Sequence, residues 1–67
     1  MEALIRNIAE YLIESWNSMS GWLKDAIESL LSAGLADAIQ NGVHALVDYL
    51  GDFSQWVLES IAWLLGL

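Results

Sequence analysis

The chain has 67 residues, 57% of them hydrophobic, and its nine acidic and two basic side chains give a formal charge of −7 at pH 7. A chain this short forms one domain at most, and alone it buries only about 60% of the surface that its unfolded form exposes. We therefore expect residues 1–67 to form a single helical domain without a separate linker domain.

The composition argues against several classes of function. Without cysteine the chain has no disulfide, no thiolate zinc site and no thiol nucleophile. Arg6 and Lys24 are the only basic side chains, which argues against binding to a nucleic-acid backbone. The sequence does not begin with the basic region and apolar core that a secretory signal peptide has. It also contains no run of 18 apolar residues that would form a conventional transmembrane helix. Any contact with a membrane should therefore use amphipathic helices.

Apolar residues recur every three or four positions from Leu4 to Leu30, which indicates one face of a helix. A narrow polar stripe follows the same period, loses phase at Ala33 and Gly34, and resumes at Asp37. The pattern predicts an all-α protein of two long amphipathic helices, about 3–32 and 35–65, hinged at Ala33–Gly34.

Glycines also mark places where these long helices can kink, namely Gly21 and Gly51. Asp52 has Gln55 three residues later, which is the spacing of a capping box at the start of a helix. Because the polar stripe passes both places in phase, we expect kinked helices rather than separate ones.

The apolar arc of each helix is wider than the stripe of roughly 100° that is typical of a soluble surface helix. A two-helix hairpin buries only the facing sides, so the outer sides must pack on other subunits or on lipid. The sequence therefore predicts a homo-oligomer that contacts membrane lipid. A soluble homo-oligomeric bundle is the alternative.

Aromatic residues lie along the edges of the polar stripe. Tyr49, Trp56 and Trp63 are spaced by seven residues and so share one edge of the second helix. Tryptophan and tyrosine, whose apolar rings carry one polar group, are enriched at membrane–water interfaces. An aromatic stripe on a helix is also common in protein cores. The predicted membrane-interface residues are Tyr11, Trp16, Trp22, Tyr49, Trp56 and Trp63.

The acidic stripe favours one kind of membrane function. An acidic face is repelled by an anionic leaflet, whereas rings of carboxylates around water favour cations over anions. We therefore predict a water-filled pore with cation preference; a solvated outer face is the alternative. The predicted pore-lining residues are Glu10, Glu14, Asp25, Glu28, Asp37, His44, Asp48, Asp52 and Glu59.

Catalytic and metal-binding chemistry is not expected. His44 and Asp48 lie four residues apart, as two metal ligands can, but a zinc site takes at least three protein ligands. So small a helical chain has no second layer to hold a Ser/His/Asp arrangement. We predict no enzyme, no catalytic residue, no metal and no cofactor.

Residues 48–51 (Asp-Tyr-Leu-Gly), then Ser54 and Trp56, followed by a leucine-rich end, resemble the PorA-type small porins of corynebacteria. The resemblance covers about the last 25 residues, and the N-terminal 30 are longer than the family pattern. It implies an acidic helical porin that assembles in the mycolic-acid outer membrane, often with a second small PorH-type subunit, and conducts ions. It also implies a covalent mycolate ester on a serine, for which Ser32 has the best-matching context.

A second, weaker resemblance is to the β-type phenol-soluble modulins of staphylococci, on residues 1–4 (Met-Glu-Ala-Leu) and the Leu/Gly-rich tail. That family is acidic, helical and surfactant-like. The sequence thus predicts an oligomeric membrane channel. The open alternatives are an acidic surfactant-like toxin and a soluble self-assembling bundle.

Overall fold

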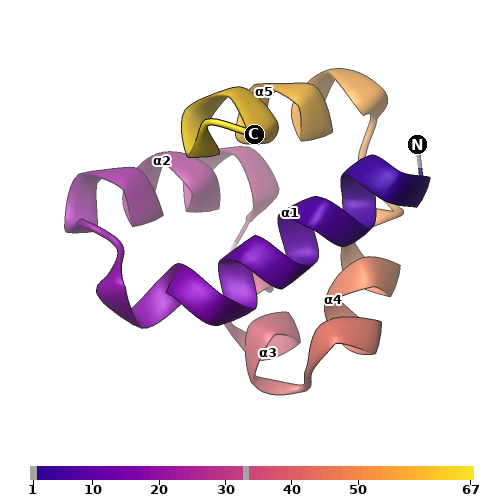
Figure 1. Cartoon of the computed structure of the whole chain (residues 1–67), viewed down its shortest axis with the longest axis horizontal. Coiled ribbons are helices and arrows are strands. Elements are labelled where there is room, and N and C mark those ends of the chain that lie inside the picture. The colour runs from indigo at the N-terminus through magenta and orange to yellow at the C-terminus, as the bar shows by residue number, and fades with distance from the viewer. Residues whose placement is uncertain (1, 33) are drawn as a thin grey trace.

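The computed structural model describes residues 2–32 and 34–67, and Figure 1 shows that this part of the chain is built from short helices. The predicted all-α class is confirmed, and the described residues contain no strand. In chain order the elements are α1 (Glu2–Ser15), the 3₁₀ turn η1 (Trp16–Ser18), α2 (Gly21–Leu31), α3 (Leu35–Gln40), α4 (Val43–Leu50) and α5 (Gln55–Leu65).

The structure divides both of the long helices that the sequence predicted. The first is interrupted after η1, where Met19 and Ser20 have extended backbone with ψ of 144° and 152°. The second is interrupted at Gly42 and again at residues 51–54. A straight helix cannot turn a wide apolar arc toward a single neighbour, whereas short helices that fold back on one another bury more of it.

The helices are interrupted where a particular glycine conformation or a capping side chain ends one helix or begins the next, and the polar stripe does not show these places. Gly42 has φ of 102° and ψ of 177°, a conformation almost restricted to glycine, and it directly precedes α4. At the start of α5 the capping residue is Ser54 and not Asp52, the residue with the capping-box spacing, because the Ser54 hydroxyl accepts the N–H of Val57 at 3.4 Å. Gly21 and Gly51 therefore lie at helix ends rather than at kinks.

The expected hinge does coincide with an interruption. Helix α2 ends at Leu31, and α3 begins at Leu35. Gly34 precedes α3 with a φ of −71°, while Ala33, the other predicted hinge residue, lies outside the described residues.

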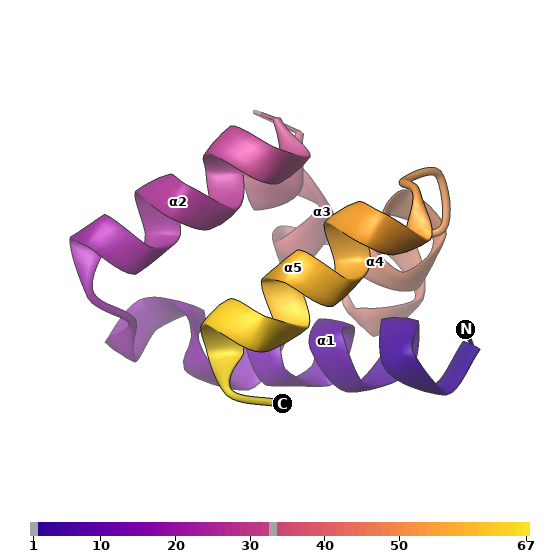
Figure 2. The same cartoon turned by 90° about the horizontal axis from the view of Figure 1, so that it is seen from above.

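Helix α1 lies along one side of the molecule, in front in Figure 1 and at the lower edge in Figure 2, and packs against α4 and α5. Helix α2 contacts α5, and α3 contacts α4. The described chain measures 27 × 23 × 19 Å along its principal axes. No polar or charged residue is buried among the described residues. Within residues 2–32 and 34–67, the core consists of 13 apolar residues from the five α-helices: Ile8, Ala9, Leu12, Ile27, Leu31, Leu35, Ala38, Leu46, Leu50, Leu58, Ile61, Ala62 and Leu65.

Helix α5 has a well-defined C-terminal end. Gly66 is left-handed, with φ of 79° and ψ of 23°, and its N–H donates to the carbonyl of Trp63 at 3.2 Å. The N–H of Leu67 donates to the carbonyl of Ala62 at 2.8 Å. These two bonds form a Schellman motif, which satisfies the last carbonyls and holds the final turn of α5 in place.

Candidate functional site

Three tryptophans lie on the surface of the molecule. Trp22 on α2 is 69% exposed, and on α5 Trp56 is 69% and Trp63 79% exposed. Helices α2 and α5 contact each other. Tryptophan is highly buried in most folded proteins, so three indoles in water are more informative than exposed aliphatic residues.

The helical period explains the exposure of the two tryptophans on α5. Leu58, Ile61 and Leu65 are buried and define the face of α5 that packs on the core. At 100° per residue, Trp56 and Trp63 fall on the opposite face, separated by nearly two full turns. The core that fixes α5 therefore turns both indoles outward.

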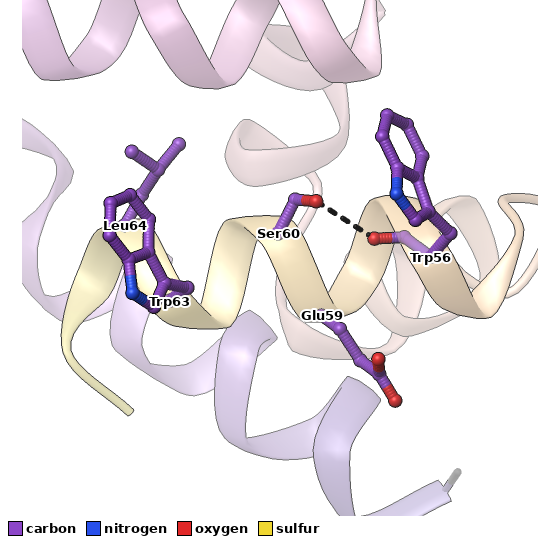
Figure 3. A pocket seen from close by; sticks show the side chains of 5 residues that line it. All are labelled: Trp56, Glu59, Ser60, Trp63 and Leu64. Atoms are coloured by element: carbon purple, nitrogen blue, oxygen red, sulfur yellow. Dashed lines mark hydrogen bonds between the residues drawn. The ribbon is translucent and has the colours of Figure 1, made fainter.

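The two indoles border an open groove of about 420 Å³, lined by Trp56, Glu59, Ser60, Trp63 and Leu64. Figure 3 shows Trp56, Ser60 and Leu64 on one side of α5 and Glu59 on the other. The Ser60 hydroxyl donates to the carbonyl of Trp56 at 3.0 Å, and the amide of Gln55 donates to a carboxylate oxygen of Glu59 at 2.8 Å. We call these five lining residues the α5 groove.

The other three predicted interface aromatics occupy less exposed positions. Tyr11 on α1 is 37% exposed. Trp16 is half-buried, and the Lys24 ammonium lies 5.6 Å from the centroid of its ring. Tyr49 is half-buried and packs edge-on against Phe53, because the turn at residues 51–54 ends the register that was expected to align it with Trp56 and Trp63.

The residues predicted to line a pore lie on the outside of the folded chain. Glu28 is half-buried, and the others are exposed: Glu10, Glu14, Asp25, Asp37, His44, Asp48, Asp52 and Glu59. They are distributed over all five α-helices and the turn before α5. In this single chain they face the surrounding solvent.

Ser32, the predicted lipidation residue, is exposed and has an unusual backbone, with φ of 79° and ψ of 174°. Its hydroxyl lies 2.8 Å from that of Tyr49, which itself donates to the carbonyl of Leu31. Because the phenolic proton is used on Leu31, the Ser32 hydroxyl is the donor to Tyr49. We call this group of three residues the Tyr49 clasp. No sequence pattern indicates it, since Tyr49 is 17 and 18 residues from its two partners.

In residues 2–32 and 34–67, no three His, Cys, Asp or Glu side chains form a group that could hold a metal ion. Across the same described ranges, no helix combines the length and the apolar character needed to cross a membrane. No family model, curated protein or solved structure shows significant similarity to the chain. The two family resemblances therefore stay predictions.

Proposed function

We propose that this protein is a membrane-active helical protein whose folded chain binds a lipid surface through Trp56 and Trp63 of α5, with Trp22 of α2 as a further anchor. The exposure of these three indoles, 69%, 79% and 69% respectively, is the observation that carries the proposal. Indoles combine an apolar body with one N–H donor and suit the boundary between hydrocarbon and water.

The polar residues beside these tryptophans favour lipid over a dry protein partner. Glu59 and Ser60 lie between the two tryptophans along α5 and line the same groove. In a protein–protein interface a carboxylate at the centre would be desolvated, which is costly unless it is paired. At a bilayer surface the indoles can enter the interface while Glu59 stays among hydrated headgroups, as long polar side chains do in general.

The net charge of the chain indicates which kind of lipid surface it binds. The chain carries a formal charge of −7, so an anionic leaflet repels it. Neutral, zwitterionic lipid presents no such barrier, and the indoles alone can supply affinity there. Moving an exposed indole into an interface contributes on the order of 2 kcal/mol.

Vesicle binding tests this proposal. The double variant Trp56→Ala/Trp63→Ala should bind neutral phosphatidylcholine vesicles about three orders of magnitude more weakly than the wild type, because about 2 kcal/mol for each indole corresponds to a factor of about thirty. Sedimentation of vesicles with bound protein measures the partition constant, and circular dichroism verifies the fold. Asn7→Ala, which shortens an exposed polar side chain on α1, is the control and should bind as the wild type does. A wild-type chain that stays in the supernatant would contradict the proposal.

Channel formation is the second candidate function. It is supported by the exposed carboxylates, because α1 to α5 each carry at least one on the surface. We propose that copies assembled in a membrane turn these carboxylates toward water and pass cations, as predicted from the sequence. A PorH-type partner, the mycolic-acid outer membrane and a mycolate ester on the exposed Ser32 belong to this same proposal.

Planar-bilayer recording under a KCl gradient tests the channel. The wild type should give discrete conductance steps with a cation-selective reversal potential. Asp48→Asn/Asp52→Asn should reduce that selectivity, because it removes two exposed carboxylates from neighbouring turns. Erratic leakage without steps would support the surfactant alternative instead. Unchanged cation selectivity in the double variant would show that neither Asp48 nor Asp52 lines the lumen.

A further inference from the structure

We propose that the α5 groove binds the quaternary ammonium headgroup of choline lipids. This inference rests on the proposed membrane binding and names the lipid group that the site recognises. It combines the two exposed indoles with the one carboxylate that lines the groove.

The spacing of the indoles suits a cation of this size. Trp56 and Trp63 are seven residues apart, which places their α-carbons about 10.5 Å apart along the axis of α5. A group seated midway lies about 5 Å along the helix axis from the α-carbon of each tryptophan, so both rings can reach it within the roughly 6 Å over which cation–π attraction acts. Figure 3 shows the two indoles at either end of the stretch that carries Glu59 and Ser60.

The charge of the groove also favours a cation. Glu59 is the only charged residue among its five lining side chains. The Gln55 amide holds one Glu59 oxygen at 2.8 Å, which keeps the carboxylate close to α5. The formal charge of −7 on the whole chain adds a negative potential that attracts cations.

The chemistry of the lining selects a methylated cation over a primary ammonium. An ammonium group brings three N–H donors that need acceptors, and here Glu59 alone offers charge. The Ser60 hydroxyl donates its proton to the Trp56 carbonyl and is the one neutral acceptor among the lining side chains, so they offer an ammonium group few acceptors for its three N–H groups. A trimethylammonium group has no N–H to satisfy, and its methyl groups can pack on the indoles and on Leu64. The same molecule already holds one cation on an indole, the Lys24 ammonium 5.6 Å from the Trp16 ring.

Soluble headgroups test the site without a membrane. Phosphocholine, titrated into the folded protein, should shift the indole N–H resonances of Trp56 and Trp63 in nuclear magnetic resonance spectra, whereas phosphoethanolamine should shift them little. Glu59→Gln should weaken phosphocholine binding about fivefold, as expected for the loss of an exposed charge pair. Glu14→Gln makes the same chemical change at an exposed residue of α1 and should leave binding unchanged. Equal effects of the two variants would overturn the inference.

Vesicles separate headgroup recognition from membrane binding itself. Wild-type protein should bind phosphatidylcholine vesicles several-fold more tightly than phosphatidylethanolamine vesicles. Trp63→Leu keeps an apolar anchor but removes a ring, so it should abolish this ratio while retaining binding to both.

The outcomes distinguish the two proposals. Equal binding to both lipids, with no phosphocholine shift, would overturn the headgroup site and leave membrane binding intact. A phosphocholine shift at Trp56 and Trp63 without binding to either vesicle would support the headgroup site and contradict membrane binding.

Discussion

Tyr49 joins parts of the chain that are far apart in sequence. Its hydroxyl donates to the carbonyl of Leu31 at the end of α2 and accepts from Ser32, while its ring packs against Phe53. A Cβ on Gly34 would lie 3.0 Å from Cε1 of Tyr49, so glycine at this position lets the ring approach. The Tyr49 clasp thus fixes the end of α2 against α4, next to the strained backbone of Ser32.

We expect Tyr49→Phe to destabilise the fold by about 1–2 kcal/mol, because it removes the donor to a partly buried carbonyl and keeps the ring. The melting temperature should fall by about 4–8 °C for each kcal/mol in a domain of this size. Thermal unfolding followed by circular dichroism measures this change. Tyr11→Phe, on the surface of α1, is the control and should change the melting temperature little; equal effects would show that the clasp adds no stability.

The helices are ended by particular residues rather than by the hydrophobic pattern. The sequence predicted helices and the break between Leu31 and Leu35, because a period of 3.6 identifies a helix and a loss of phase identifies its end. It did not predict the breaks at Gly42 and before Ser54, since the polar stripe continues through both in phase. A periodic pattern tells which face is apolar, but not whether the backbone stays helical from one turn to the next.

The helix break at Gly42, which the hydrophobic pattern does not show, can be tested by substitution. Gly42→Ala should destabilise the fold by about 1–3 kcal/mol, because a φ of 102° with a ψ of 177° strains any residue that has a Cβ. Gly21→Ala is the matched control, since a Cβ there meets nothing within 4 Å and the backbone is helical. It should be neutral or slightly stabilising. Urea unfolding of both variants measures the difference, and equal stability would mean that the turn before α4 adapts at no cost.

On the scale of the whole molecule, much of the apolar surface of the helices is buried in the core, and the indoles of α5 stay exposed. In the part of the chain that the structure describes, thirteen apolar residues from five α-helices pack into one core, which accounts for much of the surface that was assigned to neighbours or lipid. The sequence could not show this, because burial between short helices depends on how the chain turns back. The indoles of α5 were expected at the edge of the polar stripe, and their exposure follows from lying opposite Leu58, Ile61 and Leu65.

Because the surface is acidic, we expect the protein to prefer neutral over anionic lipid, whereas basic membrane-active peptides prefer anionic lipid. Vesicles with one third anionic lipid should bind the protein less tightly than neutral vesicles in 0.01 M salt, where charges interact over about 30 Å. In 1 M salt this length falls to about 3 Å, so binding to anionic vesicles should rise toward the neutral value.

The size of this salt effect depends on which charges face the membrane. One carboxylate near an anionic surface is worth about 1 kcal/mol, or about fivefold in the partition constant. Glu59 lines the α5 groove together with Trp56 and Trp63, so Glu59→Gln should reduce the salt response more than Glu14→Gln does. If binding to anionic vesicles instead falls as salt rises, Arg6 and Lys24 must face the lipid, and α5 is not the docking helix.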